Sequence, residues 1–337
     1  MKAVGLYKYL PIHNSESLID LEVEKPEPKG KDLLVKVKAI SVNPIDTKVR
    51  RSKDKMNSSP TILGWDVAGV VEAVGEDCKL FKPGDEVYYA GSITRSGANC
   101  EFHLVDERIV GMKPSSIDFA SAAALPLTVL TAWEALFERL EANQYRLEER
   151  TILIIGAAGG VGSIATQLAK LAGLKVIGTA SRPETIKWVK ENRADFVINH
   201  FADFAPQFEK IGYKSVDYIL CLNDPGEYWD KMCECITPQG KICSIVDASE
   251  NVDLSLLKNK SVTFSWESMF TKSMYKTEDM VEQHNILNLV SELIDDQLIF
   301  TTVKEILTPI NAENLKLAHS KLESGKTIGK IVLKDFQ

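Results

Sequence analysis

The stretch TILIIGAAGGVGSIATQLAKLAG, residues 151–173, decides the fold of this chain. A run of Thr, Ile and Leu ends at Gly156, four glycines fall within seven residues, and an alanine-rich helical pattern follows. A strand, a tight glycine turn and a helix are typical of dinucleotide-binding units, where the N–H groups and dipole at the helix N-terminus bind a pyrophosphate. Because a second apolar strand follows in KVIGTAS, residues 175–181, we favour this fold over a merely structural turn.

The usual fingerprint of such a turn is G-x-G-x-x-G, and the chain departs from it in one place. Ala157 takes the first glycine position, and Gly159, Gly160 and Val161 follow. We predict that these four residues bind the cofactor.

The end of the second strand predicts which nicotinamide cofactor is bound. An Asp or Glu about 20 residues after the glycines hydrogen-bonds the ribose 2′-hydroxyl in NAD-binding units. Here Ser181 takes that place and Arg182 follows it, so a 2′-phosphate meets a hydroxyl and a guanidinium instead of a repelling carboxylate. This predicts NADPH over NADH. The alternative, that Ser181 caps a helix beginning at Pro183 while Arg182 is solvated, is compatible with the same residues.

The rest of the chain divides into two kinds of pattern. Its 337 residues suggest about two domains. Residues 1–124 consist of short apolar runs between Gly, Pro and Asp turns, which indicates a barrel-like or partly open β domain. From about residue 125, apolar strands alternate with helices, which predicts an α/β domain with a doubly wound parallel sheet. One long helix is expected over 277–297.

Composition limits the partners. The net charge is −7, and the most basic stretch, KVRRSKDK at 48–55, is typical of a solvated loop, so no nucleic-acid partner is expected. No apolar run approaches the roughly 20 residues of a membrane span, and the N-terminal residues lack the apolar core of a signal peptide. The six cysteines are scattered and are expected to be free thiols, so we predict a cytoplasmic protein.

Six markers in order give the chain a resemblance to the medium-chain dehydrogenase/reductase superfamily. It is most similar to the quinone oxidoreductase branch and to zinc-type alcohol dehydrogenase-like proteins. The markers are SVNPIDTK (41–48), ILGWDVAGVVEAVG (62–75), FKPGDEV (81–87), AAALPLTVLTAWEAL (122–136), GAAGGVG (156–162) and GKIVL (329–333).

The resemblance implies a domain plan. A GroES-like, mainly-β catalytic domain would comprise residues 1–124 and 268–337, and a Rossmann nucleotide-binding domain would occupy 125–267, with the active site in the cleft. The family also commonly forms homodimers through the edge strand of the Rossmann sheet. Here that strand is VTFSW, 262–266, and its β-branched and aromatic residues predict a C2 homodimer.

The metal that the family name implies lacks its ligands. Zinc enzymes of this superfamily use a Cys, a His-Glu pair and a second Cys, which here match Asn43, Trp65-Asp66 and a residue near Pro126 or Leu127. A catalytic zinc needs about three ligands, and only Asp66 could still bind a metal. The family's proton-relay hydroxyl falls at Ile45, and the lobe that carries a structural zinc is missing. We therefore predict no zinc.

The resemblance also points to candidate catalytic residues. The amide of Asn43 could orient a carbonyl or the nicotinamide ribose, and Asp46 ends the same N-x-x-D turn. The alternative for each residue is that its side chain only caps the turn. Lys48 stands where many quinone reductases carry a Tyr. Trp65 would wall the substrate cavity or pack in the core, and Tyr89 is a plausible substrate contact. Thr131 matches a residue that hydrogen-bonds the cofactor near the nicotinamide.

These observations predict an NADPH-dependent oxidoreductase that transfers hydride to a small-molecule quinone or α,β-unsaturated carbonyl without a metal. Such acceptors need only a hydrogen-bond donor and water at the carbonyl oxygen, whereas oxidation of a simple alcohol needs a Lewis acid for the alkoxide. Two alternatives remain: a zinc-dependent alcohol dehydrogenase, and an NADPH-binding protein with little turnover.

Overall fold

The computed structural model describes residues 1–51, 56–142 and 150–336. The chain forms two compact units, one made of Met1–Leu130 with Met269–Gln337 and the other of Thr131–Ser268. The basic stretch at 48–55 lies partly outside the described residues. Within the described part, no helix is both long and apolar enough to cross a bilayer.

The second unit contains a six-stranded parallel sheet in the order β11-β10-β9-β12-β13-β14. This is the strand order of a Rossmann fold, in which the order reverses beside the first strand. The strands are β9 (Thr151–Ile155), β10 (Lys175–Thr179), β11 (Phe196–Ile198), β12 (Val216–Cys221), β13 (Ile236–Ser244) and β14 (Thr263–Trp266).

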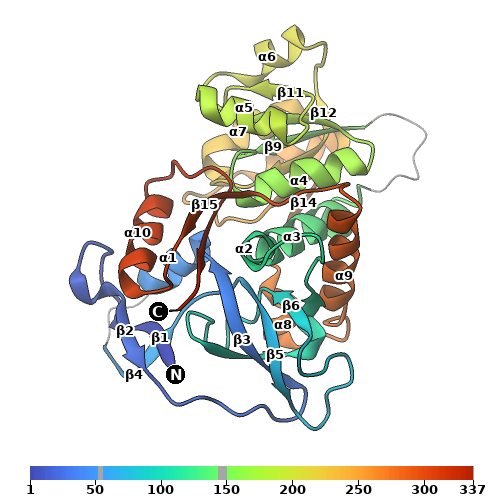
Figure 1. Cartoon of the computed structure of the whole chain (residues 1–337). Helices are drawn as coiled ribbons and strands as arrows, with labels where there is room; N and C mark the ends of the chain where they lie inside the picture. The colour runs from blue at the N-terminus through green and yellow to red at the C-terminus, as the bar shows by residue number, and fades with distance from the viewer. Residues whose placement is uncertain (52–55, 143–149, 337) are drawn as a thin grey trace. The chain divides into compact units, whose positions relative to one another are not determined.

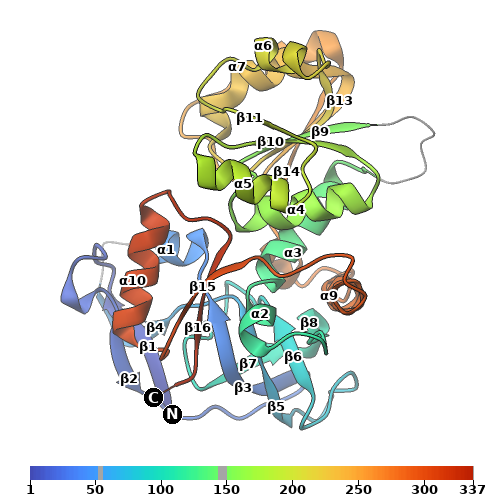
Figure 2. The same cartoon turned by 45° about the horizontal axis from the view of Figure 1, so that its top comes forward.

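Helices cover both faces of this sheet, as the unbroken apolar strands predict. Leu153 and Ile155 of β9 pack in one core with Phe204 and Trp229, which come from α6 and α7. The helices α4 and α5 lie on the opposite face (Figure 2). The doubly wound prediction is confirmed. The helical segments are α4 (Gly160–Leu171), α5 (Pro183–Glu191), α6 (Phe204–Lys210), α7 (Pro225–Cys235), the 3₁₀ segment Leu254–Lys260 and the π-helical segment Glu134–Arg139.

The first unit is built on two sheets. A three-stranded antiparallel sheet has the order β2-β1-β4, and a seven-stranded sheet has the order β15-β16-β3-β5-β6-β8 with β7 paired to β3. Figure 1 shows the long strands β3 and β5 side by side. The strands are β1 (Lys2–Lys8), β2 (Ile19–Glu22), β3 (Asp32–Ser41), β4 (Met56–Ile62), β5 (Val67–Val74), β6 (Glu86–Tyr89), β7 (Phe102–Asp106), β8 (Val110–Met112), β15 (Val303–Leu307) and β16 (Lys330–Lys334).

One helix prediction was too long. A helix was expected over 277–297, whereas α9 begins only at Glu282 and ends at Asp295. A non-helical stretch separates it from α8, which ends at Tyr275, and Lys276 in that stretch has a left-handed φ of 50°. No glycine or proline marks this break, so the helical period hides it. The helices of this unit are α1 (Pro44–Arg51), α2 (Phe119–Ala123), α3 (Pro126–Trp133, which continues into the second unit), α8 (Phe270–Tyr275), α9 (Glu282–Asp295) and α10 (Ala312–Glu323), with 3₁₀ turns at Ser15–Ser17 and Glu107–Ile109.

Candidate active site

The glycine turn after β9 has the geometry of a dinucleotide-binding loop. Gly156 has φ of 86°, a conformation that side chains rarely adopt, and its N–H donates to Thr179 Oγ1 at 3.0 Å. Gly156 therefore makes the tight turn, whereas Ala157, placed at the first glycine position from the sequence, is fully buried beneath it. Its methyl group packs toward Gly178 on β10, where a Cβ would lie only 2.9 Å away.

The N-terminus of α4 is open to a ligand. Its N-cap residue Gly159 supplies no capping side chain, and Gly160 and Val161 are half-exposed in the first turn. Their N–H groups belong to the orphan donors that a helix presents at its start. At Gly162 a Cβ would lie 2.4 Å from Gly156 O, so only glycine lets the helix approach the strand this closely. These features fit a dinucleotide pyrophosphate.

Ser181 and Arg182 lie half-buried between β10 and α5. The alternative role for Ser181 as a helix cap is wrong, because Arg182 is the N-cap residue and its backbone N–H donates to Thr185 Oγ1 at 3.1 Å. The Ser181 hydroxyl is therefore not used as a cap. The Arg182 guanidinium lies 3.4 Å from Glu184 in a partly exposed ion pair, a kind of contact that contributes little to stability.

In the first unit, Asp66 is the centre of a buried polar cluster. Gly64 has φ of 104°, and a Cβ there would lie 2.2 Å from Asn99 Oδ1. The position directly before Trp65 and Asp66 therefore requires a glycine. The antiparallel pairing of β16 with β3 then brings Lys330, at the start of β16, beside the end of β3. The three segments meet at the Asp66 carboxylate, which is completely buried.

Both oxygens of this carboxylate accept hydrogen bonds from the protein. Oδ2 accepts from Ser41 Oγ at 2.8 Å, from Asn43 Nδ2 at 2.8 Å and from Lys330 Nζ at 3.0 Å. Oδ1 accepts the Leu127 N–H at 2.8 Å, at the start of α3, where the helix dipole favours negative charge. The charge of Asp66 is thus paired and hydrogen-bonded, as a buried charge must be.

Asn43 and Asp46 have different roles in the same turn. Asp46 Oδ2 accepts the Asn43 backbone N–H at 2.7 Å, as the third residue of a helix does in a capping box, here at the start of α1. The Asn43 side chain does not cap the helix, because its two ends contact Asp66 and Lys330. Burial raises the pKa of the Asp46 carboxyl to about 7. Asp46 Oδ1 has no partner among the described residues.

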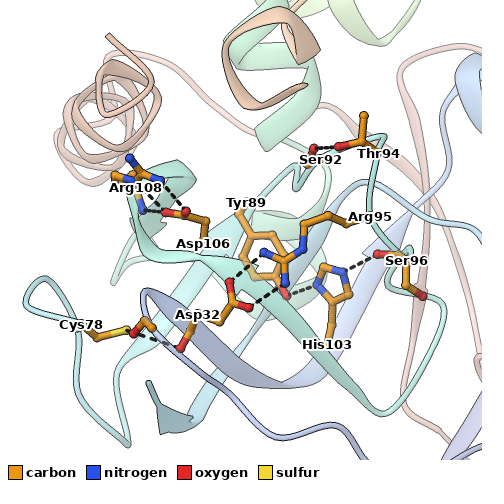
Figure 3. A network of polar contacts seen from close by, with 11 residues as sticks. Asp32, Cys78, Tyr89, Ser92, Thr94, Arg95, Ser96, His103, Asp106 and Arg108 are labelled. Carbon is orange, nitrogen blue, oxygen red and sulfur yellow. Dashed lines mark hydrogen bonds and ion pairs between the residues drawn. The ribbon is translucent and has the colours of Figure 1, made fainter. Parts of the chain in front are cut away.

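Two aromatic candidates lie in the core of this unit. Trp65 is buried, donates from Nε1 to Ser92 O at 3.2 Å and packs edge-on against Phe270. Tyr89 is also buried, and its hydroxyl lies 3.0 Å from His103 Nδ1 (Figure 3). His103 Nε2 must donate to Ser96 O at 2.9 Å, so Nδ1 accepts from the phenol. The Tyr89 hydroxyl is therefore already engaged.

The remaining candidates are a lysine and a threonine. Lys48 lies exposed on α1, and Thr131 is buried on α3. The sequence reasoning missed Lys330 and Ser41, which contact Asp66 although Lys330 is 264 residues away from it in the chain. The marker GKIVL contains Lys330, but nothing local to that motif identifies its partner. It also missed Gly156 and Thr179 in the turn.

The residues at the family's metal-ligand positions do not fit a zinc ion. The Trp65 indole is a donor only, the Leu127 side chain is apolar, and both oxygens of Asp66 already accept hydrogen bonds from protein donors, one of them the Lys330 ammonium. No group of three or more His, Cys, Asp or Glu able to hold a metal occurs among residues 1–51, 56–142 and 150–336. All six cysteines are unpaired thiols.

Known proteins share this architecture and sequence. Residues 29–124 match the alcohol dehydrogenase GroES-like domain, and residues 160–283 match the zinc-binding dehydrogenase domain. A zinc-type alcohol dehydrogenase-like protein of Staphylococcus aureus (strain MSSA476) is 42% identical over 335 residues, which covers 99% of each chain.

Solved structures agree with this relationship. A Rhizobium etli CFN 42 protein, provisionally described as a zinc-dependent alcohol dehydrogenase, is 50% identical with a TM-score of 0.96, over 100% of this chain and 98% of that one. The quinone oxidoreductase of Escherichia coli, complexed with NADPH, is 28% identical with a TM-score of 0.83, over 99% of this chain and 100% of that one. The chain therefore belongs to the medium-chain dehydrogenase/reductase superfamily and, within it, to the zinc-type alcohol dehydrogenase-like proteins of the quinone oxidoreductase-like branch.

Proposed function

We propose that this oxidoreductase reduces a quinone or an α,β-unsaturated carbonyl with NADPH and without a metal. The observation that carries the proposal is that protein donors already hydrogen-bond the Asp66 carboxylate. It is the one carboxylate left at the family's ligand positions, and Lys330, Ser41, Asn43 and the Leu127 N–H already occupy its oxygens. A cluster filled in this way offers no Lewis acid to an alcohol.

Cofactor binding is assigned to the second unit. The first-turn N–H groups of Gly160 and Val161, after the uncapped Gly159, would hold the pyrophosphate. Ser181 and Arg182 would bind the 2′-phosphate, since the guanidinium can form charge-assisted hydrogen bonds with it. The structure of the related quinone oxidoreductase of Escherichia coli is a complex with NADPH, which supports this choice. When bound, NADPH supplies the hydride.

The acceptor class follows from what the chain can stabilise. Reduction of a quinone gives an aromatic hydroquinone and reduction of an enone gives a delocalised enolate, so each needs little more than a donor at its oxygen. Asn43 Nδ2 has a second hydrogen beyond the one given to Asp66, and we assign it to the acceptor carbonyl. The proton that completes the two-electron reduction comes from water. A saturated ketone would leave a localised alkoxide that these residues cannot hold.

The proposal extends to the organisation of the protein. We assign catalysis to residues 1–124 and 268–337 and nucleotide binding to 125–267, Thr131 included. We further propose a C2 homodimer in the cytoplasm. The edge position of β14, with Trp266 52% exposed, supports pairing, and six free thiols suit a reducing compartment.

A panel of acceptors tests the reaction. Initial rates of NADPH oxidation would be measured with quinones, alkenals and saturated ketones, each with and without a chelator. We expect quinones and enones to react well above ketones, with no effect of the chelator, and simple alcohols to be inert with NADP. Rapid, chelator-sensitive oxidation of ethanol-like alcohols would contradict the proposal, and a complete lack of turnover would favour a binding protein.

A further inference from the structure

Lys330 is a buried cation with a complete shell of oxygen atoms. Only 3% of the residue is exposed, and Nζ donates to Val42 O at 3.0 Å, Asn43 Oδ1 at 2.5 Å and Asp66 Oδ2 at 3.0 Å. An ammonium has three hydrogens, so these contacts saturate it. Burying such a charge is unfavourable unless it is paired, and Asp66 is the partner.

These contacts lie at the positions where zinc enzymes of the superfamily hold their metal. Asn43 and Asp66 match two of the ligand positions, and both contact the ammonium directly. A divalent ion bound here would meet the positive charge of Lys330 at close range in a poorly solvated site, where like charges repel strongly. The same oxygens cannot serve both cations.

We propose that the Lys330 ammonium is the resident cation of this site, in place of a metal, and that it positions the Asn43 amide for the acceptor. The ammonium can only donate and therefore faces Asn43 Oδ1, while the Asp66 carboxylate can only accept and therefore faces Nδ2. The two charges fix the amide in one of its two orientations. They leave it one N–H, and the cation at the far end of the amide polarises that donor.

The role of Asn43 in this inference rests on the proposed function, but the role of Lys330 as the resident cation does not. The first experiment therefore measures thermal stability and not activity, with the variant Lys330→Ala. The variant leaves Asp66 charged and unpaired in a cavity, and we expect its thermal midpoint to fall by on the order of 10 °C. Ethylammonium or propylammonium at about 0.1 M should restore much of the loss, because either cation can enter the cavity and donate.

The controls separate charge from shape. Propanol has the shape without the charge and tetramethylammonium has the charge without N–H donors, so neither should restore the midpoint. If Lys330→Ala does not fold, Lys330→Met with Asp66→Asn removes both charges and should be more stable than either single variant. An unchanged midpoint in Lys330→Ala, or equal recovery with propanol, would overturn the assignment. So would stoichiometric zinc in the wild-type protein with a chelator-reversible rise in its midpoint.

The second experiment tests the action of Lys330 through Asn43. Lys330→Ala and Asn43→Ala should each lower kcat for an enone by about 10- to 100-fold while leaving the Kd for NADPH unchanged. The double variant should lose no more than Asn43→Ala alone, because the lysine acts through the amide. Lys113 is a matched control: it is also buried, donates to Pro114 O at 2.8 Å and Ile117 O at 2.7 Å, and Lys113→Ala should leave kcat unchanged.

Multiplicative losses in the double variant would overturn the positioning role. If the wild-type protein turns over no acceptor at all, the proposed function fails, and the thermal experiment still decides whether Lys330 is the resident cation.

Discussion

At the scale of single residues, the choice of nicotinamide cofactor depends on Arg182. Its guanidinium lies 3.4 Å from Glu184 in a partly exposed ion pair, and a guanidinium forms charge-assisted hydrogen bonds with a phosphate. Arg182→Ala should weaken NADPH binding by about 1.5–3 kcal/mol, roughly 10- to 100-fold in Kd, and leave NADH almost unchanged. Fluorescence titration of both nucleotides measures this. Lys187→Ala, which removes an exposed charge from the same helix, is the control, and equal losses for both nucleotides would rule out phosphate recognition.

His103 makes the stability of the first unit depend on pH. Burial lowers the pKa of its imidazole from 6.5 to about 4, and the neutral ring lies between Tyr89 and Ser96. The unfolded chain takes up this proton as the pH falls below 6.5 while the folded chain resists it, so stability is lost between pH 6.5 and about 4. The shift corresponds to about 3 kcal/mol.

The matching substitution is His103→Gln, which cannot titrate in this range. The wild-type protein should be the more stable at pH 7, and its advantage in free energy of unfolding should shrink as the pH falls toward 4. Urea unfolding at several pH values measures the gap, with His13→Gln, at an exposed position, as the control. Parallel curves for wild type and His103→Gln would show that this imidazole is not responsible.

At the scale of elements, the turn between β9 and α4 separates two uses of glycine. A Cβ at Gly162 would lie 2.4 Å from Gly156 O, so Gly162→Ala should displace α4 from the strand and lower both the thermal midpoint and NADPH affinity. At Gly159 the nearest atom would be 3.5 Å away and φ is −75°, so Gly159→Ala should fold normally. Its added methyl group should still hinder the pyrophosphate and weaken NADPH binding. Melting curves and titrations of both variants check this, and a normal affinity in Gly159→Ala would place the phosphates elsewhere.

How much the sequence could predict also depends on the element. The parallel sheet was predictable because apolar strands, a glycine turn and helix periods are local patterns, and α4 follows the glycine turn as those patterns predict. The break before α9 was not, since Lys276 adopts a left-handed conformation without a glycine. Lys330 was not assignable either, because its contact with Asp66 depends on the register between β16 and β3. Pairings between distant segments leave no periodic signal in the chain.

At the scale of the whole molecule, assembly depends on β14. Among the strands that the structure describes, β14 pairs only with β13, and Trp266 at its end is half-exposed. An edge of this kind can pair with its copy across a two-fold axis. Light scattering at micromolar concentration should report a dimer, and Trp266→Lys should shift it toward a monomer. Phe201→Lys changes another exposed aromatic residue of the same unit and should leave the dimer intact. A wild-type monomer would contradict the proposed assembly.

The central claim is that this reductase works without a metal because Lys330 occupies the cation position. The most direct test is to measure metal content and turnover in the same sample. Purified protein would be exposed to zinc, desalted, and divided into untreated and exhaustively chelated portions. Elemental analysis and the rate of NADPH oxidation with a quinone would then be measured on each. The structure predicts far less than one zinc per chain in both portions and identical rates. One tightly held zinc per chain, together with activity that chelation abolishes and zinc restores, would contradict it.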